Sequence, residues 1–140
     1  MNYVDTSVFV AAFAEEAHSG RAERWLTAGS QNELAISEWV VAEFSSALSI
    51  KLRSGGIDTA ARAAALEAFA VMTAKSLMLL PIVSAHFRAA ARFADRYQLG
   101  LRAADALHLA VASKEGATLC TLDKRLAKAG KALGIATKLI

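Results

Sequence analysis

Several kinds of residue are scarce in this chain of 140 residues, which has one cysteine, one proline and 7% aromatic residues. A lone cysteine excludes an intramolecular disulfide, and the context of Cys120, "ATLCTLD", is typical of a buried strand in which a thiol packs as a small hydrophobe. No apolar run approaches the roughly 20 residues that a membrane-spanning helix needs. The apolar start "VFVAAFA" is short and lacks a basic leader, so it does not resemble a secretory signal. We therefore expect a soluble, cytoplasmic protein in which Cys120 has no functional role.

Apolar residues, by contrast, are abundant. They make up 55% of the chain, and the mean hydropathy is +0.34. One core of this size is not expected to hide so much apolar surface, so part of it should form an interface with another chain. The net charge of +3 and the isoelectric point near 9.2 favour an anionic partner such as nucleic acid, although they do not identify one.

The chain shows no internal repeat, linker or block of like charge, and its length suits a single domain over residues 1–140. Short apolar runs predict strands at Asn2–Val4, Leu34–Ile36, Leu77–Leu80, Thr118–Thr121 and Thr137–Leu139. Capped helical patterns lie between them: Ser37 precedes 38–53 with Gly55 and Gly56 beyond, Asp58 precedes a run that reaches Lys75, Ser84 precedes 85–98 with Gly100 beyond, and the pattern that starts at Leu101 ends at Gly116.

The predicted strands are too short and too apolar to face water. Because helical segments separate them, they are expected to form a parallel sheet that is covered on both faces. The predicted fold is therefore a helix-rich three-layer α/β/α sandwich. In such sheets ligands bind beyond the carboxyl ends of the strands. Asp5 follows the first predicted strand and Asp123 follows the fourth, so the two acids should meet at this edge.

Four acidic residues stand within apolar sequence, where an unpaired carboxylate is costly. They are Asp5 in "YVDTSV", Glu43 in "VVAEFSSAL", Asp105 in "LRAADALHLA" and Asp123 in "TLDKRL". Each acid alone has an ordinary structural interpretation. Asp5 or Asp123 suits a helix N-cap. Asp105 suits the first turn of a helix, and Glu43 suits an ion pair across a helix face.

Taken together, the four acids indicate a metal site. Glu43 lies on the same helical face as Trp39 and Ala47. Asp105 shares a face with Leu109, so both acids should turn inward. If both helices pack at the carboxyl edge of the sheet, four carboxylates come within a few ångströms of one another and need a cation to offset their repulsion. Oxygen ligands favour Mg²⁺ or Mn²⁺, whereas zinc would want the His and Cys clusters that this chain lacks.

These motifs resemble those of the PIN-domain proteins of the VapC type, the toxins of VapBC toxin-antitoxin pairs. The resemblance runs nearly end to end, through "YVDTSV", "ISEWVVAEFSSAL", "LGLRAADALHLAVA" and "GATLCTLDKRL" in that order. It implies a metal-dependent endoribonuclease that holds Mg²⁺ or Mn²⁺ and hydrolyses RNA with water as the nucleophile. The catalytic and metal-binding residues that it implies are Asp5, Glu43, Asp105 and Asp123, supported by the hydroxyl-bearing residues Thr6 and Ser7.

The resemblance also implies partners. In VapC proteins the early helices build a hydrophobic cleft for the carboxyl-terminal segment of a VapB-like antitoxin, and a separate helical surface forms a homodimer. The surplus of apolar residues agrees with both, and no membrane partner is expected. The larger aromatic side chains of the amino-terminal half suit either the core or such a groove; they are Trp25, Trp39, Phe44 and Phe69.

Basic residues are candidates for contacts with RNA phosphates. One set crowds the segment that begins beside Asp123 and comprises Lys124, Arg125, Lys128 and Lys131. Another set recurs every four residues along a predicted helix and comprises Arg88, Arg92 and Arg96. A solvated helix face explains such sets as well as an RNA contact does, and the first set is the stronger candidate because it adjoins the expected metal site.

Histidine offers two interpretations at one position. His108 comes three residues after Asp105 and shares its helical face, so it suits either a hydrogen-bonded core residue or a contact with metal or substrate. His18 and His86 lie near predicted helix starts and carry no pattern.

Two other classes of protein compete with the nuclease. A non-catalytic PIN-like RNA-binding or scaffold protein would have no need of four partly buried acids. A receiver domain of the response-regulator type also gathers acids at the edge of a parallel sheet. It needs an acidic pair before its first helix, however, and "NYVDTS" contains one acid.

Overall fold

The structure is a computed structural model that describes residues 1–14, 19–28 and 33–140, so His18 lies outside the described residues. Its centre is one sheet of five strands in the order β3-β2-β1-β4-β5, and every neighbouring pair is parallel. The strands are β1 (Asn2–Val4), β2 (Leu34–Ser37), β3 (Met78–Leu80), β4 (Thr118–Thr121) and β5 (Thr137–Leu139). Each predicted strand is confirmed to within one residue.

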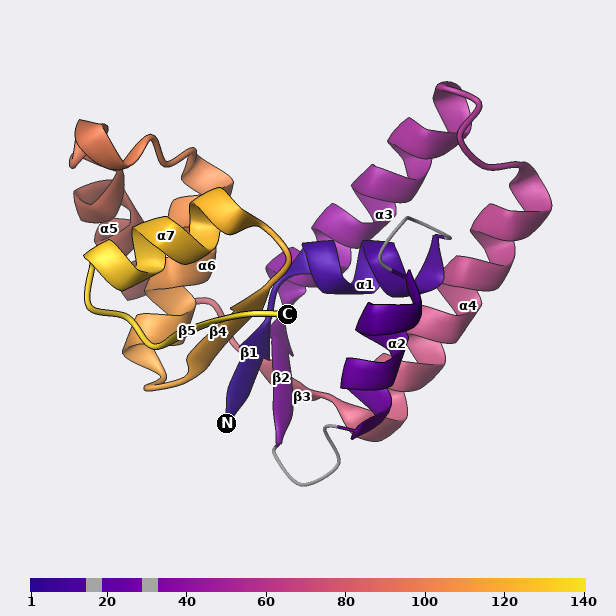
Figure 1. Ribbon diagram of the computed structural model, residues 1–140, viewed down its shortest axis with the longest axis horizontal. Helices are drawn as coiled ribbons and strands as arrows, with labels where there is room; N and C mark the ends of the chain where they lie inside the picture. Colours follow the sequence, from indigo (N-terminus) through magenta and orange to yellow (C-terminus); the bar gives the residue numbers. More distant parts are fainter. Residues whose placement is uncertain (15–18, 29–32) are drawn as a thin grey trace.

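Helices cover both faces of this sheet, which confirms the three-layer α/β/α sandwich. They are α1 (Thr6–Phe13), α2 (Ser19–Ala28), α3 (Glu38–Arg53), α4 (Thr59–Ser76), α5 (Ser84–Ala94), the 3-10 turn η2 (Tyr97–Leu99), α6 (Ala103–Lys114) and α7 (Lys124–Ala132). Figure 1 shows α1 to α4 on one side of the strands and α5, α6 and α7 on the other. Within the described ranges, no helix combines the length and the apolar character that crossing a membrane requires.

The core surrounds the central strand, β1, and includes buried side chains of α1, α3 and α4. Tyr3 and Val4 in β1 are fully buried, because β1 has a strand on each side and helices on both faces. An aromatic cluster joins α1, α3 and α4: the ring of Phe69 lies 5.1 Å from that of Phe9 and 4.2 Å from that of Phe44. The core interpretation of Phe44 and Phe69 is thus confirmed.

One predicted helix is wrong at both ends. Ser84 does not precede the helix but is its first residue, and Val83 takes the N-cap position. The Nδ1 atom of His86 accepts a hydrogen bond from Val83 N at 3.0 Å, so it satisfies the backbone amide in place of a serine hydroxyl. The helix ends at Ala94 rather than at Gln98, and a 3-10 turn leads to Gly100, whose φ of 62° suits a residue without a β-carbon.

Gly130 lets α7 lie close to its neighbours. A β-carbon on this residue would overlap Thr137 Oγ1 in β5 and would approach Leu109 Cδ2 in α6 to 3.0 Å. The absence of a side chain therefore sets how near α7 comes to the sheet. Because Asp123 stands at the start of α7, this packing also sets where that acid lies.

The order of the strands creates a switch point. From β1 the chain winds outward through β2 to β3, and it then returns to the other side of β1 for β4 and β5. Connections at the carboxyl ends of β1 and β4 therefore diverge, which is where ligands bind in sheets of this kind. Asp5 directly follows β1, and its backbone amide donates to the carbonyl of Cys120 in β4 at 3.1 Å.

Cys120 itself has a packing role. Burial raises the pKa of its thiol to about 11, so the thiol is not a reactive thiolate.

Candidate active site

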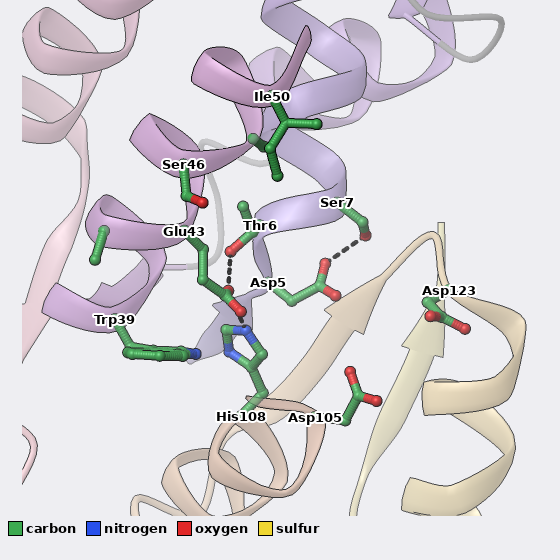
Figure 2. Close-up of a pocket in the computed structure, with 12 residues that line it drawn as sticks. Asp5, Thr6, Ser7, Trp39, Glu43, Ser46, Ile50, Asp105, His108 and Asp123 are labelled. Carbon is green, nitrogen blue, oxygen red and sulfur yellow. Dashed lines mark hydrogen bonds and ion pairs between the residues drawn. The ribbon is translucent and has the colours of Figure 1, made fainter. Parts of the chain in front are cut away.

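A pocket of about 620 Å³ lies at this switch point. All four acids predicted from the sequence line it, together with the two predicted hydroxyl residues (Figure 2). The lining residues are Asp5, Thr6, Ser7, Trp39, Ala42, Glu43, Ser46, Ala47, Ile50, Asp105, His108 and Asp123. They come from the loop after β1, from α1, α3 and α6, and from the start of α7.

Asp5 is the most buried of the four acids, with 4% of its surface exposed. It occupies the N-cap position of α1, but its side chain does not cap that helix. Instead Ser7 Oγ donates to Oδ1 at 2.6 Å (Figure 2). On the other oxygen, Thr121 Oγ1 donates to Oδ2 at 2.8 Å. Burial raises the pKa of Asp5. The electrostatic attraction of His108 and the hydrogen bonds from Ser7 and Thr121 offset only part of that rise.

Glu43 projects from α3 and is half-buried. Its Oε2 atom accepts hydrogen bonds from Thr6 Oγ1 and from His108 Nε2, the latter at 2.7 Å. Burial by itself would raise the pKa of Glu43. The hydrogen bond and electrostatic attraction of His108 and the hydrogen bond of Thr6 outweigh that effect, so the pKa of Glu43 lies below its usual value.

Asp105 lies in the first turn of α6 and is half-buried. Figure 2 shows its carboxylate on the pocket wall, on the side of the pocket where Asp5 and Asp123 also lie. No described residue donates a hydrogen bond to it or forms an ion pair with it, which sets it apart from the other three acids. Its oxygens are therefore free for a ligand.

Asp123 caps α7, as one sequence interpretation predicted. Its Oδ1 atom accepts from the backbone amides of Arg125 at 2.7 Å and of Leu126 at 3.1 Å. Neither of these bonds engages Oδ2. The residue is half-buried and lines the pocket, so its capping role leaves one oxygen for a ligand.

The structure therefore brings the four acids to one pocket but does not place them as closely as the sequence predicts. Across residues 1–14, 19–28 and 33–140, no three His, Cys, Asp or Glu side chains are already arranged as ligands of one ion. The physical reason is that three of the acids are held by protein donors. Hydroxyl groups hold Asp5, a hydroxyl and an imidazole hold Glu43, and backbone amides hold Asp123.

Sequence reasoning missed several residues of the site. His108 is a buried, hydrogen-bonded residue, as one of its two interpretations predicted, but its bond to Glu43 was not predicted; a contact with metal or substrate stays a prediction. Tyr3 and Ser37 hydrogen-bond to one another and extend this contact into the core, and Thr121 holds Asp5. The proximity of His108 to Asp105 was a usable signal. Nothing in the sequence near Tyr3, Ser37 or Thr121 indicated their roles.

Trp39 is half-buried and lines the pocket, so it is not wholly a core residue. Its Nε1 atom is buried and makes no hydrogen bond to a described residue, although it is near enough to Glu43 to help lower the pKa of that acid. Trp39 thus belongs to the wall of the pocket on the α3 side (Figure 2).

The chemistry of the donors suits a hard divalent cation. The pocket offers carboxylate oxygens of four acids and hydroxyl oxygens of Thr6 and Ser7. The only described histidine on its wall, His108, has both ring nitrogens engaged by Tyr3 and Glu43. An oxygen-only set matches Mg²⁺ or Mn²⁺ better than zinc.

The basic residues next to the pocket are all exposed. Lys124, Arg125, Lys128 and Lys131 lie on α7, whose opposite face is buried through Leu126, Ala127, Ala129 and Gly130. Arg88, Arg92 and Arg96 are likewise exposed, on or just after α5. The structure places the α7 set beside Asp123, as the sequence predicted.

Known proteins share this architecture. A profile of the PIN-domain family matches residues 3–132. The structure of Mycobacterium tuberculosis VapC20, described as a sarcin-ricin loop cleaving toxin, has a TM-score of 0.72 at 22% identity, with 96% of each chain covered. Rickettsia felis VapBC2, solved with a DNA fragment from its promoter, has a TM-score of 0.74 at 19% identity, covering 100% of this chain and 99% of that one. Neisseria gonorrhoeae FitAcB has a TM-score of 0.67 at 18% identity, covering 98% and 96%. No curated protein matches the chain.

Proposed function

This chain belongs to the PIN-domain family, and we propose that it is the VapC-type toxin of a toxin-antitoxin pair, an endoribonuclease that depends on Mg²⁺ or Mn²⁺. The observation that carries the proposal is the pocket. Four acids from separate parts of the chain line one cavity at the switch point of the sheet, where ligands bind in this class of fold. A scaffold protein would gain nothing from holding a buried carboxylate such as Asp5 there.

The residues that would hold the cation are Asp5, Glu43, Asp105 and Asp123. When bound, a divalent cation supplies Lewis acidity that polarises the phosphodiester and stabilises the negative charge that develops on it. Thr6 and Ser7 keep the carboxylates of Glu43 and Asp5 in place through hydrogen bonds. Side chains fixed in this way need little rearrangement when the substrate arrives.

Hydrolysis also requires a group that accepts a proton from the attacking water. Water adds to phosphorus, one ester bond breaks, and the leaving oxygen takes up a proton from a solvent water. Asp105 is the acid of the pocket that has no partner among the described residues, so we assign it the proton from the attacking water. The carboxylates of Asp5 and Glu43 are already engaged by hydroxyl and imidazole donors.

RNA is the proposed substrate. The chain carries a net charge of +3, and an exposed basic helix begins at the residue after Asp123. Lys124, Arg125 and Lys128 would bind phosphates on either side of the scissile bond. VapC20, which has a similar fold, is described as cleaving the sarcin-ricin loop, and this supports an RNA substrate. The proposal also places the protein in the cytoplasm.

The proposed protein partner is a VapB-like antitoxin, alongside a homodimer of this chain. An apolar pocket of about 420 Å³ lies between α1, α2 and α4 and is lined by Phe13, Leu26 and Met72 among others. It lies in the early helices, where the resemblance predicts the antitoxin cleft. Large apolar side chains are also exposed elsewhere, including Phe87 at 57% and Val83 at 51%, which suits a second interface.

The test is cleavage of RNA by purified protein with Mg²⁺ or Mn²⁺. We expect cleavage by the wild type, none in EDTA, and none by Asp105→Asn at an unchanged Tm. Asp95→Asn is the matched control, because Asp95 is an exposed acid at the end of α5 and lies outside the pocket. This variant should cleave like the wild type.

Three results would contradict parts of the proposal. Equal cleavage in EDTA and in Mg²⁺ would remove the metal from the mechanism. RNA binding without cleavage, under conditions in which the protein is folded and either metal is present, would favour the non-catalytic RNA-binding alternative. Light scattering that shows a strict monomer, together with harmless expression in cells, would contradict the proposed dimer and toxin.

A further inference from the structure

A continuous line of buried side-chain hydrogen bonds leads from the core to Glu43. Ser37 Oγ lies 2.8 Å from the hydroxyl of Tyr3, and that hydroxyl lies 3.0 Å from His108 Nδ1. On the other side of the ring, His108 Nε2 lies 2.7 Å from Glu43 Oε2. The four residues come from β2, β1, α6 and α3, so this line crosses the sheet and both helix layers.

The line is deeply buried everywhere except at Glu43. Ser37 and Tyr3 are fully buried, and His108 is 3% exposed. Ser37 stands at the N-cap of α3, yet its side chain does not cap the helix, and its hydroxyl is directed to Tyr3 instead. Phenylalanine would fill the position of Tyr3 equally well in a purely apolar core. The polar groups therefore have a role other than packing.

The chemistry of the groups fixes the direction of each bond. An ionised Glu43 can only accept, so His108 must carry a proton on Nε2. In a neutral imidazole Nδ1 is then an acceptor, and the hydroxyl of Tyr3 is the donor that faces it. The oxygen of Tyr3 in turn accepts from Ser37. Every donor thus points toward Glu43.

We propose that Tyr3 and Ser37 are positioning residues that hold His108 in the tautomer with its proton on Nε2, and that His108 in turn fixes the orientation of the Glu43 carboxylate. Both the His108 and the Thr6 bonds engage Oε2, and neither engages Oε1. The fixed carboxylate therefore presents Oε1 to the pocket. This inference rests on the proposed function, in which Glu43 is a metal ligand, and it extends the site to two residues that do not touch the pocket.

The decisive variant is Tyr3→Phe, which removes one oxygen and keeps the ring. Loss of an outer partner of a metal ligand typically lowers metal affinity or activity by about 10–100-fold. We expect a loss of this size in Mn²⁺ affinity and in kcat, with the KM for RNA unchanged, because the basic residues of α7 are not affected. Ser37→Ala should give a smaller loss in the same direction. Tyr97→Phe, at the other tyrosine, which is 81% exposed, should change neither quantity.

A readout that does not depend on activity is the ¹⁵N spectrum of histidine in the metal-free protein. The wild type should show His108 protonated on Nε2 and unprotonated on Nδ1, and the His108→Gln spectrum identifies these signals. In Tyr3→Phe the Nδ1 signal should shift. His86 serves as an internal reference, because its Nδ1 accepts from Val83 N, and its signals should stay the same.

The outcomes separate this inference from the proposed function. Unchanged His108 signals in both Tyr3→Phe and Ser37→Ala, or a wild-type ring protonated on Nδ1 alone, would overturn the inference even if the protein cleaves RNA. So would wild-type kcat and Mn²⁺ affinity in a folded Tyr3→Phe variant. A wild type that neither binds Mn²⁺ nor cleaves RNA, with the expected His108 signals, would overturn the proposed function instead. If Tyr3→Phe fails to unfold cooperatively, Ser37→Ala decides by the same two readouts.

Discussion

The two sides of the pocket hold their acids in different ways. On the inner side, next to β1 and α3, Asp5 and Glu43 accept hydrogen bonds from hydroxyl and imidazole groups that the core keeps in place. On the outer side, at the starts of α6 and α7, Asp105 has no side-chain partner among the described residues and Asp123 is bound only by backbone amides. The inner acids are thus oriented by tertiary contacts, and the outer acids by the helices that carry them.

A metal site needs ligands in a fixed geometry and also ligand oxygens that are open to the ion. The two sides of the pocket would each meet one of these requirements. The inner acids give fixed geometry, which requires burial and therefore affects stability. The outer acids give charge and open oxygens at little energetic cost, because they stay half-exposed. A site with both kinds can keep its shape without a cation and still offer free ligands. The following experiments test whether the two sides behave in this way.

The largest expected effect is on cleavage. Asp5→Asn and Asp105→Asn should each lower kcat by more than the roughly 10–100-fold that loss of an outer partner causes. The double variant should be hardly slower than either single variant, because residues that act as one unit are strongly non-additive. Single-turnover cleavage of a defined RNA measures all three. Losses that multiply would mean that the two sides work independently.

The second effect is on stability, and it separates Asp5 from Asp105. Burial raises the pKa of Asp5 above the value of about 3.9 in an unfolded chain, so the folded state prefers the protonated form. The ionised carboxylate consequently lowers stability at neutral pH. Asp5→Asn should therefore have a higher Tm than the wild type at pH 7 in EDTA, and this advantage should disappear as the pH falls below about 4. Asp105→Asn should have a wild-type Tm at pH 7, because this half-buried acid has no hydrogen-bond partner to lose among the described residues.

Glu43 should show the opposite sign on the same side of the pocket. Its pKa is lowered in the folded protein, so its ionised form contributes stability above the unfolded pKa of about 4.3, and that contribution is lost as the pH falls through the folded pKa. Glu43→Gln should lower the Tm at pH 7, and the difference from the wild type should shrink as the pH falls below about 4.3. Thermal unfolding across this pH range checks both acids. A higher Tm for Glu43→Gln at pH 7 would show that the His108 and Thr6 bonds do not offset its burial.

A smaller effect should separate the two roles of Asp123. Asparagine caps helices about as well as aspartate, so Asp123→Asn should keep the Tm and lose activity by roughly tenfold. Asp123→Ala should in addition lower the free energy of unfolding by about 1 kcal/mol, because the amides of Arg125 and Leu126 lose their acceptor. Full activity in Asp123→Asn would leave Asp123 as a cap alone.

The smallest effect should come from outside the pocket. The double change Arg125→Ala and Lys128→Ala should raise the KM for RNA and lower the salt dependence of binding by a slope of about 0.7 per lost phosphate contact. Hydrolysis of a small phosphodiester should stay near the wild-type rate. The control pair Arg88→Ala and Arg92→Ala, on α5, tests whether any exposed basic face has the same effect. An equal loss on both substrates would mean that α7 supports the site itself.

What the sequence predicted correctly was encoded locally. Each strand is a short apolar run, and the acid at the end of β1 and the cap of α7 are visible within a few residues. The start of α5 was mispredicted because the ring of His86, and not a serine hydroxyl, accepts the hydrogen bond of the backbone amide at its N-cap. Two expectations stay predictions: that one PIN domain spans all of residues 1–140, and that the four acids bind metal.

Contacts between distant segments could not be predicted in this way. Ser37 resembles an ordinary N-cap in the sequence, and only the arrangement of β1 beside β2 turns its hydroxyl toward Tyr3. The distances among the four carboxylates, which the sequence predicted to be short, could not be predicted from the sequence either. Which donors hold each carboxylate depends on side chains from other elements, so their spacing cannot be read from any one motif.

The hydrogen bond from Thr121 to Asp5 joins residues that are 116 positions apart. Helices form in about a microsecond or less, whereas pairing of distant strands must first overcome the entropy of closing a long loop. Asp5 therefore gains its second hydroxyl partner only when β4 docks beside β1, which is a late event in any folding route that builds α1 to α4 first. During refolding from denaturant, recovery of nuclease activity should accordingly lag behind recovery of helical circular dichroism. Under the proposed function, a chain whose helices are complete would not cleave RNA until β4 has paired with β1.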